Sequence, residues 1–355
     1  MAKLGIVGRP NSGKTTLFNA LCGLDAPVAA HPFSTTEVNL GVAKIPDEWL
    51  ERGAEVESSA KIVHATLELM DVPQVPGSKE LSPDALGKLR EMDAMMVVLR
   101  AFEDAAAPAS ESGTDPAAQA EELLLELALA DVDVFTKRSQ RAAKEATADV
   151  AMKPQADAFT QASQLLADGS PLRAEQWSPA QRDFFRDLAP LSLKPAVWVI
   201  NAGEDEATEE LEETVAAVVP DGDAVVSLSA RIEYEASQLD PQEREELFEG
   251  LGLGKGALSK MVRAAYLALD LTTFYTLGPK EAHAWSVRSG SIAPEAAGKI
   301  HSDLERGFIR AEVAGIAEVV EAGGWDAAKA AGLVRLEGRD YVIAEGDVIE
   351  VRFSV

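Results

Sequence analysis

Residues 8–15, near the N-terminus, read Gly-Arg-Pro-Asn-Ser-Gly-Lys-Thr and fit the pattern G-x-x-x-x-G-K-[ST] at every fixed position. The segment follows a short apolar run, Lys3–Val7, and leads into a helical pattern that ends near Cys22. Its glycines would let main-chain N–H groups wrap around a phosphate, and the helix N-terminus would add partial positive charge. In such a loop Lys14 bridges the outer phosphates and the Thr15 hydroxyl binds magnesium. The spacing therefore predicts a site for a nucleoside triphosphate with Mg²⁺.

A carboxylate ends another apolar run further along the chain. Asp71 directly follows residues 66–70, which read as a core strand. This is where a phosphate-binding loop of this type finds the carboxylate that helps to hold its magnesium ion. An aspartate at the end of a core strand can also be a helix cap or a turn former. The motif upstream favours the magnesium role.

A third segment follows a buried strand at Asn201, where an open α/β sheet holds its ligand. GTP-binding proteins of this fold carry Asn-Lys-x-Asp here, and the aspartate accepts from the guanine N1–H and 2-amino groups. In this chain Ala202 and Glu204 replace the lysine and the aspartate, and adenine lacks those donors, so ATP is favoured over GTP. Asn201 could still bond the purine edge, with Ser229 and Ala230 supplying backbone contacts; the alternative is an ordinary turn. The predicted nucleotide-binding residues are Arg9, Pro10, Asn11, Ser12, Gly13, Lys14, Thr15, Thr16, Asn201, Glu204, Ser229 and Ala230.

The elements that must position these residues alternate between strands and helices. This alternation predicts an α/β fold with a doubly wound parallel sheet, of the P-loop NTPase type. The predicted strands are Lys3–Val7, Ile62–Met70, Ala94–Arg100, Pro195–Asn201 and Ala224–Ser229.

A helical segment interrupts the alternation between the third and fourth strands. Residues 105–120 predict a loop, and residues 121–148, 154–167 and 179–188 predict helices that form an inserted antiparallel hairpin. A further helix is expected at 258–269.

Beyond residue 270 the pattern changes to short strands and turns, which predict a small α+β domain. The expected domains are a nucleotide-binding domain (1–104 and 191–270), the helical insertion (105–190) and the C-terminal domain (271–355). The elements predicted in the last are strands at Thr272–Thr276, Ala282–Val287, Tyr341–Ile343 and Val348–Phe353 and a helix at 294–305.

The composition argues against several functions. A net charge of −26 opposes general nucleic-acid affinity, which depends on Lys and Arg, so no DNA partner is expected. No apolar run reaches the roughly 20 residues that span a bilayer, and the N-terminus lacks the features of a signal peptide. The single cysteine, Cys22, cannot form an internal disulfide. Together these features predict a cytoplasmic protein with no membrane partner.

The motifs together resemble the YchF family of Obg-like ATPases over almost the whole chain. The resemblance implies a cytosolic ATPase that associates with ribosomes and ends in a TGS domain. It also implies that Thr35, in a Pro-Phe-x-Thr switch segment, ligates magnesium when a triphosphate is bound. The segments that carry the resemblance are 5–21, 31–37 with Asn39, 126–131, 201–204, 273–276, 284–285, 296–303, 305–312 and 346–349.

One segment departs from the family pattern. The family reads Asp-x-Ala-Gly followed by a long glycine-rich loop, whereas residues 71–77 read Asp-Val-Pro-Gln-Val-Pro-Gly and the loop is shortened before Leu81. Gln74 replaces the glycine whose N–H meets the γ-phosphate, and the prolines at 73 and 76 remove donors. We therefore expect slow or absent hydrolysis, with binding better preserved than catalysis. Alternatively, Gln74 itself positions the attacking water.

Three functions stay open from the sequence. The first is an ATPase whose phosphate state modulates ribosome or translation-factor association. In it, Lys14, Thr15, Thr35 and Asp71 with magnesium would stabilise charge during in-line attack of water on the γ-phosphate. The second is a nucleotide-gated binding module with negligible turnover. The third is a GTPase.

Two further features concern ions and RNA. Asn11 resembles the asparagine that ligates potassium in cation-activated relatives, so K⁺ is a candidate cofactor; the alternative is that Asn11 simply suits the turn. Lys137, Arg138, Arg141 and Lys144 would form a basic face on the first helix of the insertion. That face either contacts ribosomal RNA or is a solvated surface paired with neighbouring acids.

Overall fold

The computed structural model describes residues 2–23, 39–73, 80–104, 113–203, 208–254 and 256–354. The chain folds into two compact units. The larger unit contains Ala2–Val42 and Glu68–Ala268, and the smaller contains Ala43–Leu67 and Leu269–Val355. The sequence predicts residues 43–67 as part of the nucleotide-binding domain, whereas they fold together with the C-terminal segment.

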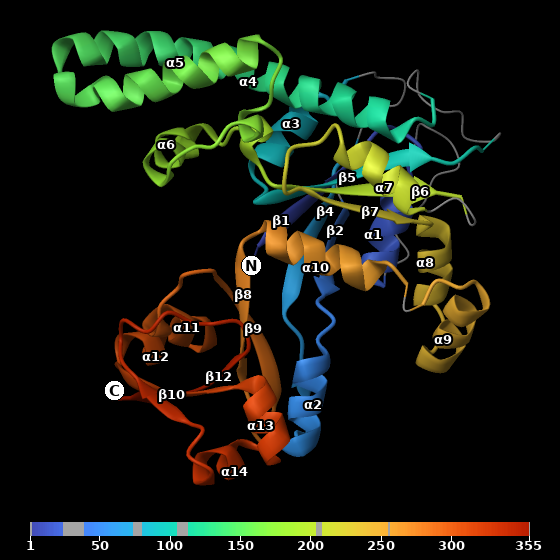
Figure 1. The fold of residues 1–355 in the computed structure, drawn as a ribbon, viewed down its shortest axis with the longest axis vertical. Coiled ribbons are helices and arrows are strands. Elements are labelled where there is room, and N and C mark those ends of the chain that lie inside the picture. Colours follow the sequence, from blue (N-terminus) through green and yellow to red (C-terminus); the bar gives the residue numbers. More distant parts are fainter. Residues whose placement is uncertain are drawn as a thin grey trace. The chain divides into compact units, whose positions relative to one another are not determined.

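A six-stranded sheet with the order β2-β4-β1-β5-β6-β7 forms the centre of the larger unit (Figure 1). β1 is parallel to β4 and β5, and β6 is parallel to β5 and β7. The carboxyl ends of these strands therefore meet at one edge of the sheet. This is the predicted doubly wound fold. The strands are β1 (Lys3–Val7), β2 (Asn39–Lys44), β4 (Thr66–Asp71), β5 (Ala94–Ala101), β6 (Ala196–Ala202) and β7 (Ala224–Leu228).

The strand predicted at 62–70 is wrong as a single element. Ile62–Val63 form β3, which pairs with a strand of the smaller unit, and only Thr66–Asp71 enter the larger sheet. β2 was not predicted, because its sequence has no strong apolar pattern. In the structure its two largest apolar side chains, Leu40 and Val42, are exposed.

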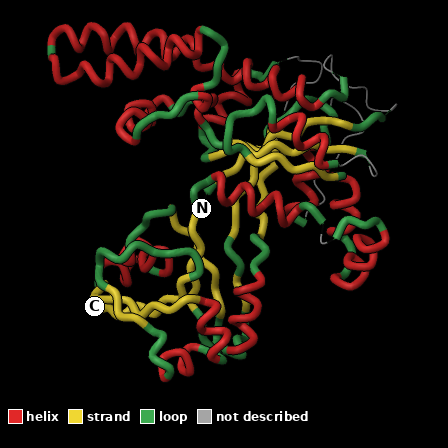
Figure 2. The backbone as a smooth tube through the Cα atoms, in the orientation of Figure 1, coloured by secondary structure: helices red, strands yellow, loops and turns green. Residues whose placement is uncertain are grey.

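Helices cover both faces of this sheet, as Figure 2 shows by colour. α3, α4 and α7 bury Leu89, Leu123, Leu127 and Val215 against the inner strands. α1 and α10 lie on the opposite face (Figure 1). The helices of the larger unit are α1 (Lys14–Cys22), α3 (Pro83–Arg90), α4 (Pro116–Ala148), α5 (Lys153–Ala167), α6 (Pro179–Phe185), α7 (Glu209–Ala216), α8 (Ala230–Ser237), α9 (Pro241–Gly250) and α10 (Leu258–Ala268). Short 3₁₀ turns lie at Val150–Met152, Leu172–Ala174, Arg186–Leu188 and Leu191–Leu193.

The inserted hairpin is built on α4, which has 33 residues. α4 begins at Pro116, within the stretch predicted as a loop, because the Asp115 side chain accepts from the N–H groups of Ala117 and Ala118. α5 returns along the distal half of α4 (Figure 1), and α6 packs at its side. The core of the hairpin is aromatic: its ring centroids lie 5.0–5.9 Å apart. Its members are Phe135, Phe159, Trp177 and Phe185.

The smaller unit contains a second six-stranded sheet, with the order β11-β10-β12-β8-β9-β3. It matches the predicted α+β pattern with two corrections. The strand expected at 341–343 makes only an isolated bridge from Val342 to Ile292, and the helix expected at 294–305 is divided at His301. Its strands are β3, β8 (Leu271–Thr276), β9 (Ala282–Arg288), β10 (Phe308–Gly315), β11 (Arg335–Glu337) and β12 (Asp347–Phe353). Its helices are α2 (Glu48–Val56), α11 (Ala293–Ile300), α12 (Ser302–Arg306), α13 (Ile316–Ala322) and α14 (Trp325–Ala330).

A membrane-spanning helix is absent from the described part of the chain, where no helix combines sufficient length with sufficient apolarity.

Candidate nucleotide-binding site

The loop at residues 8–13 joins β1 to α1 at the carboxyl edge of the large sheet. Its conformation depends on two glycines. A Cβ at Gly8 would lie 2.2 Å from the Val98 carbonyl oxygen. Gly13 is the N-cap of α1 with a φ of 93°, in the left-handed region that favours glycine. Asn11 is also left-handed, with a φ of 62°, as asparagine tolerates.

Lys14, the first residue of α1, turns back over this loop. Its Nζ donates to the carbonyl oxygens of Gly8, at 2.8 Å, and Arg9, at 2.9 Å. Burial lowers the pKa of Lys14 from 10.5 to about 8, while the nearby charge of Asp71 opposes that shift. The ammonium group is thus held at the phosphate loop by two acceptors.

The predicted magnesium-binding side chains of Thr15 and Asp71 lie together. The register Ile6↔Asp71 places the end of β4 beside the start of the loop. Thr15 Oγ1 donates to Asp71 Oδ2 at 2.8 Å, and Asn39 Nδ2 donates to the same oxygen at 3.2 Å. Asp71 is buried. The structure therefore brings a hydroxyl from the residue after Lys14 together with the carboxylate that ends β4.

Asn201 connects the phosphate loop to the start of α8. Its Nδ2 donates to the Ser12 carbonyl oxygen at 2.9 Å, and its Oδ1 accepts from the Ala230 N–H at 2.9 Å. Ser229 is the N-cap of α8, where its hydroxyl accepts from the Ile232 N–H. Both ends of the Asn201 amide therefore bond main-chain groups, one in the phosphate loop and one at the start of α8.

The remaining predicted residues are placed as follows. Pro10 lies in the loop and Thr16 in the first turn of α1. Thr35, Gln74 and Glu204 lie outside the described residues.

Arg100, at the carboxyl end of β5, was not predicted. Its guanidinium donates from Nε to the Phe102 carbonyl oxygen at 3.0 Å and from Nη1 to the Asn11 carbonyl oxygen at 3.5 Å. It also stacks over the Phe102 ring, and burial lowers its pKa. Among the described residues, its buried Nη2 and the buried Ser12 hydroxyl have no hydrogen-bond partner. The sequence shows an arginine at the end of a core strand, which does not by itself indicate a contact with the loop.

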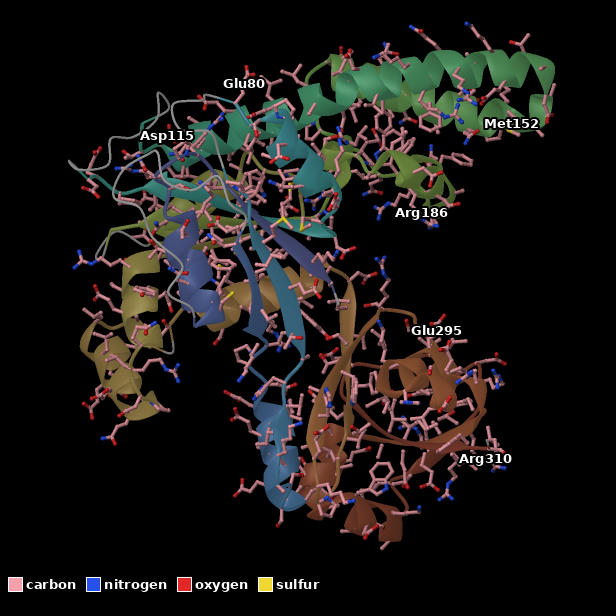
Figure 3. The ribbon with its side chains drawn as sticks, turned by 180° about the vertical axis from the view of Figure 1, so that it is seen from behind. Glu80, Asp115, Met152, Arg186, Glu295 and Arg310 are labelled. Carbon is pink, nitrogen blue, oxygen red and sulfur yellow. The ribbon has the colours of Figure 1, made fainter. Side chains whose placement is uncertain are left out.

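Glu126 of α4 is a second residue that was not predicted at the nucleotide site. Its Oε2 lies 3.1 Å from Arg9 Nη1, and Glu122 Oε2 lies 3.4 Å from Arg9 Nη2. The phosphate loop is therefore ion-paired to the N-terminal part of α4. In Figure 3, Asp115 and Glu80 lie near this part of α4, and Met152 lies at the far tip of the hairpin.

Two family models match parts of this chain. Residues 3–135 match the family model MMR_HSR1, described as 50S ribosome-binding GTPase. Residues 271–354 match the model YchF-GTPase_C, described as a protein of unknown function (DUF933).

Full-length relatives cover both units. The chain is 36% identical over 361 residues to the ribosome-binding ATPase YchF of Bacillus subtilis (strain 168), with 99% of each chain covered. It is 32% identical over 367 residues to Obg-like ATPase 1 of Pongo abelii, covering 99% of this chain and 92% of that one. The structure of the Schizosaccharomyces pombe YchF GTPase matches with a TM-score of 0.87 at 26% identity, covering 99% of this chain and 97% of the other. With the phosphate loop, the inserted hairpin and the C-terminal sheet all in place, the chain belongs to the YchF family.

Proposed function

We propose that this chain is a magnesium-dependent ATPase that associates with ribosomes. The observation that carries the proposal is the contact of Thr15 with Asp71 beside the loop-bound Lys14. The relatives named ribosome-binding ATPase and Obg-like ATPase support the activity and the partner. A ribosomal partner in turn favours the cytoplasm as the place of action.

Magnesium fits the donor set at this site. Mg²⁺ prefers oxygen ligands, and at nucleotide sites it takes one or two carboxylates plus phosphates and waters. Thr15 and Asp71 offer that minimal set. In the described part of the chain, no three His, Cys, Asp or Glu side chains come together to form an all-protein metal cage. When bound, the ion would neutralise charge on the β- and γ-phosphates. Thr15, Asp71 and the predicted Thr35 would hold it.

The residues of the chain supply binding and orientation. The N–H groups at the start of α1 would donate to a bound phosphate, and the Lys14 ammonium would add positive charge. Because Lys14 already bonds two loop carbonyls, little reorganisation is needed when phosphate arrives. With Thr35 and Asp71, Lys14 would stabilise the charge that develops during attack of water.

ATP is proposed over GTP on the sequence Asn-Ala-Gly-Glu at 201–204. An aspartate that pairs with the guanine edge is missing from this segment, and Asn201 is engaged with Ser12 and Ala230. Calorimetric titration with ATP, GTP and ADP in the presence of Mg²⁺ tests the preference. Tighter binding of GTP than of ATP would overturn it.

A binding module with negligible hydrolysis is the second candidate function. It is favoured by the prolines at 73 and 76, which cannot donate to a γ-phosphate. The first of them follows Val72, whose N–H is already bonded to the Ile6 carbonyl oxygen. In this reading nucleotide binding, rather than turnover, controls partner association.

Phosphate release with and without ribosomes separates the two functions. Release above that of a Lys14→Ala control supports the ATPase. Its absence under both conditions, with ATP binding intact, supports the binding module.

The same assay is run in K⁺ and in Na⁺, because Asn11 is the proposed potassium ligand. Equal rates of phosphate release in the two salts would rule out potassium as a cofactor.

A ribosomal RNA contact through the basic residues of α4 is less well supported. Arg138 and Arg141 both pair with Glu145, and Lys137 lies 4.0 Å from Asp133. Arg138 also lies over the Phe159 ring. These pairs favour the solvated surface, so we do not assign the ribosome contact to this face.

A further inference from the structure

The ion pair between the phosphate loop and α4 is shielded from solvent. The side chains of Arg9 and Glu126 are only 12% and 13% exposed, whereas Glu122, the second partner of Arg9, is 47% exposed. Exposed pairs contribute little because water and salt screen them, and half-buried pairs contribute more. The Arg9–Glu126 contact is therefore the stronger link between the loop and the helix.

The other oxygen of the same carboxylate has a different partner. Glu126 Oε1 accepts from the main-chain N–H of Leu81. Leu81 is buried and directly precedes Ser82, the N-cap of α3. Upstream, the Val72 N–H is bonded to the Ile6 carbonyl oxygen. The connection that follows Asp71 is thus anchored at Val72 and again at Leu81, and the second anchor is the carboxylate that holds Arg9.

We infer that Glu126 is a positioning residue for the nucleotide site, whose carboxylate fixes the phosphate loop relative to the end of the connection that follows Asp71. The inference rests on the proposed function and adds a residue from the inserted helix to it. The link to the chemistry runs through Arg9. The Arg9 carbonyl oxygen accepts from Lys14 Nζ at 2.9 Å, so a shift of Arg9 moves an acceptor that orients the lysine. Loss of the Glu126 charge would weaken the hold on Arg9, whose other charged partner here is the exposed Glu122, while leaving every phosphate-binding group in the chain.

The groups around this carboxylate determine its response to pH. Burial raises the pKa of Glu126 and the charge of Glu80 adds to that rise, whereas the Leu81 N–H and Arg9 lower it. The same helix contributes Glu122, which competes for Arg9. Protonation of Glu126 should therefore begin at a higher pH than for an ordinary glutamate. A protonated Glu126 cannot form the ion pair, so MgATP affinity should fall on acidification in the wild-type protein.

The test is calorimetric titration of MgATP into full-length protein. Glu126→Gln keeps the shape and an acceptor for the Leu81 N–H but removes the charge. We expect it to weaken MgATP binding about 10-fold, and Arg9→Leu to do the same; the double variant should be no weaker than either, because contacting residues are non-additive. Glu121→Gln is the matched control. It removes one charge from an exposed position of the same helix and should bind within about twofold of wild type.

The outcomes distinguish the inference from the function on which it rests. If the wild-type protein does not bind MgATP, the proposed function fails. If it binds and Glu126→Gln binds equally well, or if the two single effects multiply in the double variant, the positioning role is overturned. Should Glu126→Gln fail to fold, Arg9→Leu carries the test. Its MgATP affinity must fall less on acidification than that of wild type, and a fall of the same size in both proteins overturns the role.

Discussion

The side-chain amide of Asn201 fills the space beside Gly13. A Cβ added to Gly13 would lie 2.1 Å from Asn201 Nδ2, well inside van der Waals contact. The same nitrogen donates to the Ser12 carbonyl oxygen, so it cannot withdraw without breaking that bond. Glycine is therefore required at position 13 both by its left-handed φ and by a side chain from the end of β6.

The first prediction concerns Gly13→Ala. The substitution combines a left-handed strain of about 1–2 kcal/mol with the clash against Asn201. We expect MgATP affinity to fall by at least 10-fold, measured by calorimetry. In an Asn201→Ala background the clash is removed but the strain stays, so the further loss caused by Gly13→Ala should be smaller.

Gly23→Ala separates strain from contact. Gly23 caps the other end of α1 with a φ of 59°, and no atom of the described residues lies within 4 Å of a Cβ built there. This variant should lose stability from strain alone and keep nucleotide affinity. Equal loss of affinity in Gly13→Ala and Gly23→Ala would show that contact with Asn201 plays no part.

The second prediction concerns Asp71→Asn. Asparagine retains one acceptor for the Thr15 hydroxyl but removes the negative charge from a buried position beside Lys14. Loss of a carboxylate that holds or orients a metal typically costs about 10–100-fold in affinity for it. We expect the Mg²⁺ concentration that gives half-maximal ATP binding to rise by that factor.

Asp93→Asn is the matched control for Asp71→Asn. The Asp93 carboxylate accepts from the Lys3 N–H, at the start of β1 and thus away from the carboxyl edge that carries the phosphate loop. The Mg²⁺ concentration that gives half-maximal ATP binding should be the same in Asp93→Asn as in wild type. An unchanged requirement in Asp71→Asn as well would remove Asp71 from the metal site.

The phosphate loop could be predicted from the sequence because its chemistry is local. Gly13, Lys14 and Thr15 are adjacent in the chain, and a strand and a helix of ordinary pattern flank them. The position of Asp71 near the loop could be predicted for a related reason, since the ends of parallel strands meet at one edge of a sheet. The parallel core strands of the main sheet followed from the same apolar runs, whereas β2 at its edge did not.

The supports of the loop could not be predicted, because each joins distant parts of the chain. Asn201 was expected at the purine, and its bonds to Ser12 and Ala230 were not predicted. Arg100 and Glu126 reach the loop from a neighbouring strand and from the inserted helix, and neither position carries a local motif. Residues 43–67 were misplaced for the same reason, since only the three-dimensional fold groups them with the C-terminal sheet.

The third prediction concerns the hairpin core. Phe185 is fully buried, and its ring lies 5.0–5.4 Å from those of Trp177, Phe135 and Phe159. Phe185→Ala should destabilise the hairpin by about 3–5 kcal/mol through lost burial and a cavity. Hydrogen exchange of the amides in α5 reports this loss directly.

Nucleotide affinity should change little in Phe185→Ala, because the loop contacts of α4 lie in its N-terminal turns. Leu125→Ala is the control, since Leu125 is 46% exposed and its removal leaves no cavity. Unchanged exchange rates in α5 of Phe185→Ala would contradict the proposed role of the aromatic cluster in stability.

The fourth prediction concerns the pH dependence of ATP binding above neutrality. Burial lowers the pKa of Lys14 to about 8 in the nucleotide-free protein, and a bound polyphosphate favours the charged form, so binding must raise that pKa. As pH rises past about 8, the free protein loses the proton that the complex retains. Affinity should then fall by up to about 10-fold per pH unit until the pKa of the complex is reached.

Calorimetry between pH 7 and pH 9.5 measures this fall in affinity. Titrations in buffers of different ionisation enthalpy should show that the protein takes up a proton when ATP binds. Lys14→Arg, which stays charged throughout, should bind more weakly at pH 7 but lack the alkaline fall. An affinity for wild type that is constant across this window would show that Lys14 is already fully charged in the free protein.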